Sequence, residues 1–224
     1  MPKVLFIACH PDDETLGCGG TILKHKALGD EIYWAILTNI DENNGWPKDK
    51  VLSRQCEISA VARAYGFKKV FKLDFPTTKL DAIPMNTIVS AISNTLNEIK
   101  PEVIYVPNKS DIHSDHKTTF DAVMSCTKTF RFPYIKRVLM YECLSETEFA
   151  PAISNLAFTP NVFVNISAYV SEKIKIMNMY EGEMGAFPFP RSAENIEALA
   201  RYRGATAGFC GAEAFVLIKE RCDD

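Results

Sequence analysis

The sequence predicts an α/β fold in which a mainly parallel sheet carries helices on both faces. Short apolar runs rich in β-branched residues alternate along the chain with longer segments of helical periodicity, as βαβ units require. The 224 residues are 47% apolar and 24% charged, which suits one globular domain with a substantial core. We therefore expect a single domain over residues 1–224, built as a Rossmann-like three-layer α/β/α sandwich.

The first half of the chain contains four expected strands and three expected helices. Apolar runs predict strands at 4–7, 31–38, 69–73 and 103–107. Helical spacing predicts helices at 15–28, 50–65 and 86–99, the first with a glycine-rich start that permits close backbone packing. Gly29 and Gly66 end two of these helices, and Pro101 ends the third. The polar stretch 39–50 follows the second strand, where loops of open α/β sheets line ligand crevices.

The second half continues the alternation of strands and helices. Helices are expected at 118–129, 168–182 and 193–202, and strands at 137–141, 161–166 and 213–218. In a parallel sheet of this kind, the loops after the first and fourth strands can lie side by side at the carboxyl edge. Functional residues on those two loops are therefore expected to lie close together at that edge.

Composition excludes several classes of function. A formal net charge of −3 argues against binding to a nucleic-acid backbone as the main task. No apolar run approaches the roughly eighteen residues of a membrane span, and no secretory signal pattern opens the chain. Seven cysteines without C-x-x-C spacing indicate neither a zinc knuckle nor a thioredoxin-type motif. We expect reduced thiols in a cytoplasmic protein without stable membrane insertion; a homo-oligomer is left open.

The stretch directly after the first strand is unusual for a structural turn. Residues 8–14 read Ala-Cys-His-Pro-Asp-Asp-Glu, which places one imidazole and three carboxylates within five residues. Sheltered carboxylates cost free energy unless a positive charge lies among them, and a divalent metal would supply it. His10 and Asp13 are three apart and can reach one ion, while Asp12 points elsewhere. An acidic first helical turn is the alternative, but it accounts poorly for His10 and Pro11.

A second polar stretch follows the fourth strand. Residues 108–117 contain two of the four histidines, His113 and His116, which share one face of a nascent helix. Two nitrogens and one carboxylate oxygen with an open fourth position are typical of catalytic zinc, whose bound water has a pKa near 7. Asp12 can then take the proton of the water, and the histidine that does not bind metal can assist an oxyanion or a leaving amine. The residue types predict metal-assisted hydrolysis of an acyl derivative.

These two stretches resemble the LmbE/PIG-L superfamily of zinc-dependent N-deacetylases, which carry A-H-P-D-D-E after strand one and H-x-D-H after strand four. The similarity includes Gly19-Gly20-Thr21, Arg54-x-x-Glu57, the stretch 73–76 and the closing stretch 212–215. Cys9 and Ser114 depart from the usual residues of the two motifs. Because adjacent strand residues face opposite sides, Cys9 is not expected to be a fourth ligand.

The resemblance implies a role for each matching position. It implies His10, Asp13 and His116 as zinc ligands and Asp12 as the general base. His113 would polarise the carbonyl group, with its ring oriented by Asp115. Arg54 would contact the substrate, although an i, i+3 surface pair with Glu57 is the ordinary explanation for an arginine at this spacing. Asp74 lies where a contact with a substrate hydroxyl is expected.

The implied reaction removes an N-acetyl group from an N-acetylglucosamine-type conjugate, a small-molecule partner. The alternatives are a metal-dependent amidase or esterase acting on a non-sugar acyl compound, and a non-catalytic sugar or nucleotide-binding protein on the same fold. Retention of Asp12 disfavours a binding protein, and the missing G-x-G-x-x-G fingerprint disfavours a dinucleotide-dependent oxidoreductase. The stretch 185–191 offers aromatic faces and one cation to a sugar ring, with an ordinary packed loop as the alternative.

Overall fold

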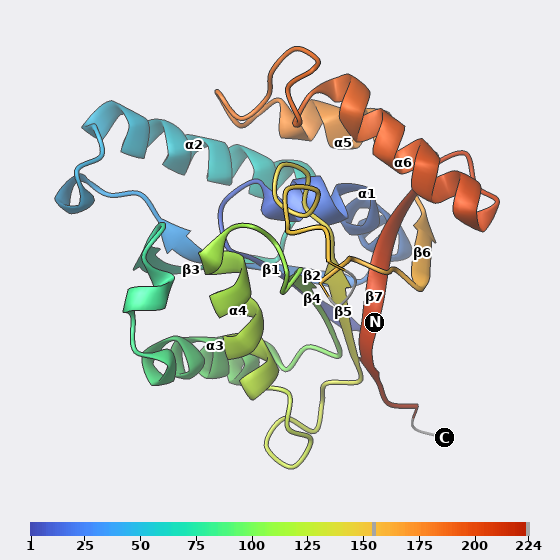
Figure 1. The fold of residues 1–224 in the computed structure, drawn as a ribbon. Helices are drawn as coiled ribbons and strands as arrows, with labels where there is room; N and C mark the ends of the chain where they lie inside the picture. Colours follow the sequence, from blue (N-terminus) through green and yellow to red (C-terminus); the bar gives the residue numbers. More distant parts are fainter. Residues whose placement is uncertain (154–155, 223–224) are drawn as a thin grey trace.

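A single seven-stranded sheet forms the centre of the molecule, in the strand order β3-β2-β1-β4-β5-β7-β6 (Figure 1). The computed structural model describes residues 1–153 and 156–222. The strands are β1 (Lys3–Ala8), β2 (Glu31–Asn39), β3 (Lys69–Pro76), β4 (Val103–Pro107), β5 (Arg137–Tyr141), β6 (Val162–Asn165) and β7 (Ala212–Glu220). All seven expected strands are therefore confirmed, with ends that differ by a few residues.

The five strands β1 to β5 are parallel, and β7 runs antiparallel to both of its neighbours, β5 and β6. In the central pair, Leu5 of β1 is in register with Ile104 of β4. Parallel pairing puts the carboxyl ends of β1 and β4 at the same edge. This arrangement brings together the two polar stretches that the sequence separates by about a hundred residues.

Helices cover both faces of the sheet, as expected for three layers. The α-helices are α1 (Asp13–Leu28), α2 (Lys48–Tyr65), α3 (Met85–Ile99), α4 (Ser114–Ser125), α5 (Val170–Met177) and α6 (Ala193–Ala207), with short 3-10 turns η1 (Glu42–Asn44) and η2 (Leu80–Ala82). One core lies under α1, α2, α5 and α6, and the other under α3 and α4. No helix within the described ranges is long and apolar enough to cross a bilayer.

The first helix begins two residues earlier than expected, and this position matters for the site. Helix α1 starts at Asp13, inside the acidic stretch, and includes the glycine-rich segment as predicted. The glycines allow this because α1 packs closely on the sheet. A Cβ on Gly17 would lie 2.2 Å from Tyr141 Cδ2, and one on Gly20 would lie 2.6 Å from Ile166 Cβ. The first turn of α1 is thereby held at the carboxyl edge of the sheet.

Candidate metal centre and active site

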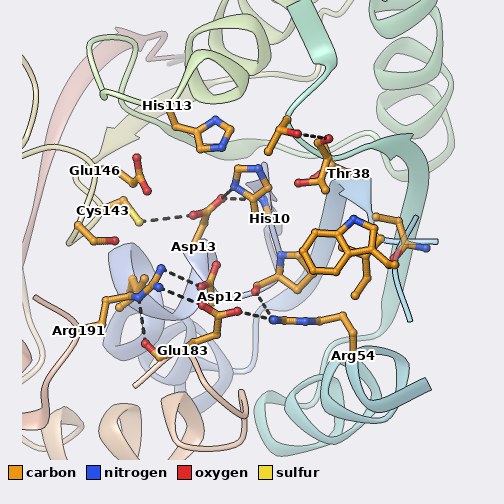
Figure 2. Close-up of a pocket in the computed structure, with 18 residues that line it drawn as sticks. His10, Asp12, Asp13, Thr38, Arg54, His113, Cys143, Glu146, Glu183 and Arg191 are labelled. Atoms are coloured by element: carbon orange, nitrogen blue, oxygen red, sulfur yellow. Dashed lines mark hydrogen bonds and ion pairs between the residues drawn. The ribbon is translucent and has the colours of Figure 1, made fainter. Parts of the chain in front are cut away.

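A cavity of about 300 Å³ opens at the carboxyl edge of the sheet. Segments that follow β1, β2, β3, β4 and β5 line it, together with Glu183 and Arg191 from the C-terminal part of the chain. Figure 2 shows His10, Asp12 and Asp13 in the middle, Thr38 and Arg54 on one side, and Glu146, Cys143 and Arg191 on the other. Polar residues of distant segments thus converge on one hollow, which is the usual form of a small-molecule site.

Three donor groups meet at the cavity: His10 and Asp13 line it, and His116 lies fully buried against Asp13. Asp13 Oδ2 lies 3.7 Å from His10 Nδ1 and 3.3 Å from His116 Nε2. Nε2 of His116 is buried without a hydrogen-bond partner. Burial lowers the pKa of His116, but Asp13 and Asp111 outweigh burial and raise it well above the usual range. The site therefore favours positive charge at this nitrogen, which a divalent cation supplies as well as a proton does.

The second ring nitrogen of each of these two histidines faces a carboxylate. His116 Nδ1 lies 2.8 Å from Asp111 Oδ2, and His10 Nε2 lies 3.4 Å from Asp115 Oδ2. Carboxylates in these positions orient metal-ligating histidines and fix their tautomers. These residues therefore fit a divalent metal ion. Sequence reasoning missed Asp111; its position five residues before His116 was the only available signal.

The sulfur of Cys9 lies closer to this cluster than expected. Cys9 Sγ is 3.8 Å from His10 Nε2, and its distances to a nitrogen of His10 and of His116 are both within 4.8 Å. Strand alternation fails as a guide here because β1 ends at Ala8, one residue earlier. The thiol also accepts a hydrogen bond of 3.4 Å from the Thr119 hydroxyl.

Asp12 has an unusual backbone conformation, with φ of 136°. Its amide N–H donates to Glu14 Oε2 at 3.1 Å, and its carbonyl accepts from the amides of Thr15 and Leu16 at the start of α1. Contacts on both sides of the residue thus hold a conformation that L-residues rarely adopt. Burial, together with the charges of Asp13 and Glu183, raises the pKa of Asp12, whereas Arg191 opposes the shift. A nearby cation would favour its ionised form.

Glu14 is fully buried beneath Asp12. It accepts hydrogen bonds from the hydroxyls of Thr15 (2.6 Å) and Tyr180 (2.7 Å), and burial raises its pKa to about 7 despite these bonds. Its carboxylate oxygens are occupied by these contacts and by the amide of Asp12, and Glu14 does not line the cavity. Glu14 therefore supports the backbone of the site.

His113 lines the cavity and caps α4. Its Nδ1 accepts a hydrogen bond of 3.1 Å from the backbone N–H of Asp115. Burial and the nearby histidines lower its pKa, so the neutral ring is favoured. With Nδ1 acting as acceptor, the ring proton resides on Nε2, which leaves a donor for a ligand. The backbone of Asp115 orients this ring, while its carboxylate faces His10 and the amides of Thr78 and Leu80.

Two arginines converge on one glutamate at the wall of the cavity. Arg54 donates to the Pro11 carbonyl at 3.1 Å, pairs with Glu57 at 3.2 Å, and contacts Glu183. Arg191 lies 3.0 Å from Glu183 and 3.6 Å from Asp12. The expected pair with Glu57 is present, yet Arg54 also lines the cavity. Sequence reasoning missed Glu183, for which no pattern gave a signal.

Asp74 is a candidate site residue that does not line the cavity. It is exposed and accepts a hydrogen bond of 3.1 Å from Asn39, which does line the cavity. The stretch 185–191 contributes Arg191 to the lining, but its exposed phenylalanines do not take part. Trp46 lines the cavity, as expected for the stretch 39–50, and so does Glu146, which was not singled out in the sequence.

The fold, together with side chains that fit a divalent metal ion, agrees with a hydrolase of the deacetylase class. Residues 5–127, more than half of the chain, match the model of the PIG-L family, GlcNAc-PI de-N-acetylase. The chain therefore belongs to the PIG-L family, which confirms the resemblance seen in the sequence.

Individual relatives agree with this assignment. A diacetylchitobiose deacetylase of Thermococcus kodakarensis is 25% identical over 97% of this chain and 84% of its own length. The solved N,N'-diacetylchitobiose deacetylase of Pyrococcus horikoshii has a TM-score of 0.78 at 21% identity, covering 97% of this chain and 84% of that one. A 4-carboxy-2-hydroxymuconate hydratase of Pseudomonas putida has a TM-score of 0.74 at 17% identity, covering 100% and 99%. The fold is thus shared by enzymes that catalyse different reactions. The residues of the site, and not the fold, indicate which reaction is catalysed.

Proposed function

We propose that this single-domain protein is a zinc-dependent hydrolase that removes the N-acetyl group from an N-acetylglucosamine-type conjugate. The observation that carries the proposal is the convergence of His10 and Asp13, which line the cavity, with the buried His116, and with Asp12 beside them. Family membership supports the amide as the bond that is broken. The names of the relatives support an N-acetyl amino sugar as the substrate.

His10, Asp13 and His116 would hold the metal ion, with Asp111 and Asp115 orienting the two rings. When bound, zinc activates a water molecule and polarises the acyl oxygen. The mixed nitrogen and carboxylate donor set, with solvent access through the cavity, is that of a catalytic rather than a structural zinc site.

Asp12 is assigned as the general base. Its carboxylate would accept a proton as the water oxygen attacks the acetyl carbon, a role that contributes typically about 10²- to 10⁴-fold in rate. The Nε2–H of His113 would donate to the acyl oxygen as negative charge develops there. The C–N bond then breaks, and the proton held by Asp12 is available to the departing amine. The products are acetate and a free amino sugar.

Arg54 and Asp74 are assigned to the conjugate rather than to the chemistry. Arg54 borders the cavity and can donate to substrate hydroxyls while Glu183 and Glu57 fix its position. Asp74 would act through Asn39, which borders the cavity. The cavity therefore presents both donors and acceptors to the hydroxyl groups of a sugar.

Acetate release distinguishes this function from its alternatives. The zinc-loaded protein should release acetate from N-acetylglucosamine conjugates faster than from N-acetyl amino acids or O-acetyl esters. The deacetylated amine should appear in equal amount by mass spectrometry. Faster release from the non-sugar amides or esters would replace the proposal with an amidase or esterase. Bound zinc and bound sugar without any acetate would indicate a binding protein.

A further inference from the structure

Trp46 is an aromatic side chain on the wall of the cavity with no role in the proposed chemistry. It is 42% exposed, on the segment between β2 and α2, and it lies in the same cavity lining as Thr38, Asn39 and Arg54. An exposed tryptophan costs free energy in water unless something covers it, and its flat face suits an apolar surface. Its position therefore indicates contact with a ligand.

The backbone holds Trp46 in place before any ligand arrives. Asp41 accepts hydrogen bonds from the Asn44 amide through Oδ1 (3.0 Å) and from the Trp46 amide through its carbonyl (3.3 Å). Gly45 has φ of 85°, a conformation that favours glycine, and Pro47 caps α2. The backbone that carries Trp46 is thus fixed between a turn and a helix start, so it loses little freedom when a ligand binds.

The size of the cavity limits how much of a sugar conjugate it can enclose. Its volume of about 300 Å³ is at the lower end of the range for ligand pockets. The N-acetyl group must lie over the metal ligands, so the ring that carries it occupies most of this space. A second ring of a conjugate would have to lie near the opening, where Trp46 remains half exposed. The exposed Phe187 and Phe189 do not border the cavity and cannot substitute for it.

We infer that Trp46 is the stacking platform for a second ring, so that the substrate class is a ring-bearing conjugate of N-acetylglucosamine rather than the free monosaccharide. The C–H face of a saccharide or cyclitol ring would cover the indole. This inference rests on the proposed deacetylase function, and it adds the residue that selects the group attached to the sugar.

Tryptophan fluorescence tests the contact without requiring turnover. The chain has two tryptophans, and Trp34 is fully buried in the core, so a ligand-dependent change in emission reports on Trp46. The zinc-loaded Asp12→Asn protein would be titrated with N-acetylglucosamine and with N,N'-diacetylchitobiose. The disaccharide should change the emission more than the monosaccharide at saturation, and Trp46→Phe in the same background should abolish the change. An equal response to both sugars would overturn the inference.

Kinetics provide the second arm. Trp46→Ala should raise KM for the disaccharide about fivefold more than KM for the monosaccharide, with Trp46→Phe in between, because an aromatic face contributes roughly 1 kcal/mol. Phe130→Ala, which removes a 78% exposed aromatic outside the cavity, is the matched control and should change neither. An unchanged KM ratio in an active enzyme would overturn the role of Trp46 alone. Absence of acetate release with intact fluorescence responses would instead overturn the proposed function.

Discussion

At the scale of single residues, the site depends on which nitrogen of each histidine is already engaged. His116 directs Nε2 toward Asp13 because Asp111 holds Nδ1, and His113 has Nε2 free because the Asp115 amide occupies Nδ1. Two histidines three positions apart on one helix thereby acquire different tasks. The difference arises from their hydrogen-bond partners and not from the residue type.

Asp111 provides a test of the orienting carboxylate. Asp111→Asn keeps the shape but removes the charge that faces His116, so zinc affinity should fall about 10- to 100-fold. Metal competition with a chelator measures this change. His116→Ala should lose zinc altogether, because it removes a ligand.

Asp121 lies on the same helix as His116, and its carboxylate pairs with Lys109, which precedes the helix. It offers a matched control. Asp121→Asn should bind zinc as the parent does. Parental zinc affinity in the Asp111→Asn protein would show that this carboxylate does not support the ligand.

Asp12→Asn tests the general base. The amide has nearly the same shape and no basic oxygen, so the deacetylation rate should fall about 10²- to 10⁴-fold while zinc stays bound. The rate is measured from acetate released at fixed times, and the zinc content is measured by elemental analysis of the same sample. Loss of zinc from this variant would make Asp12 a ligand, and a retained rate would move the base to another residue.

At the scale of elements, one buried ion pair connects three of them. Lys173 of α5 lies 2.7 Å from Glu213 of β7 and donates to the Leu16 carbonyl of α1 at 2.7 Å. Glu213 also accepts from the amides of Gly20 and Thr21 in α1. The pair thus fixes the helix whose first turn carries Asp13.

Breaking this pair should destabilise the fold. Lys173→Met leaves the buried Glu213 without its cation, which should lower the free energy of unfolding by about 3–5 kcal/mol. Urea denaturation measures the change. Lys175→Met removes the exposed partner of Glu172 on the same helix and should cost only about 0–1 kcal/mol. Equal losses in the two variants would show that the buried pair has no special contribution.

At the scale of the whole molecule, the proposed metal would join the loop after β1 to the start of α4. Its ligands come from segments that are close only when the parallel sheet has formed, so the ion should bind the folded chain and not the unfolded one. Zinc at about 100 times its dissociation constant should then raise the free energy of unfolding by roughly 2.7 kcal/mol.

Thermal unfolding with zinc and with a chelator checks this expectation. The midpoint should rise with zinc and return to the starting value with chelator in the parent protein. His116→Ala should not respond. The same rise in that variant would place the stabilising ion somewhere other than the proposed centre.

The sequence by itself determined the sheet, its layers and the part of the site that lies at strand ends. Apolar runs fixed the seven strands, and the βαβ alternation placed the carboxyl ends of β1 and β4 at one edge. His10 and Asp13 follow β1 directly and His116 opens α4, so local position along the chain was sufficient to bring them together. Helix ends were less certain, and α1 starts two residues earlier than expected.

Only the tertiary structure decided the surroundings of those residues. Glu183 and Arg191 reach the cavity from the C-terminal part of the chain, Trp46 faces it from a turn, and the Cys9 sulfur lies near the histidines. Periodicity reports which face of an element is buried, but contacts between loops depend on how the elements pack. For that reason the proposed metal ligands could be predicted from the sequence, whereas Asp111, Glu183 and the approach of the Cys9 sulfur could not.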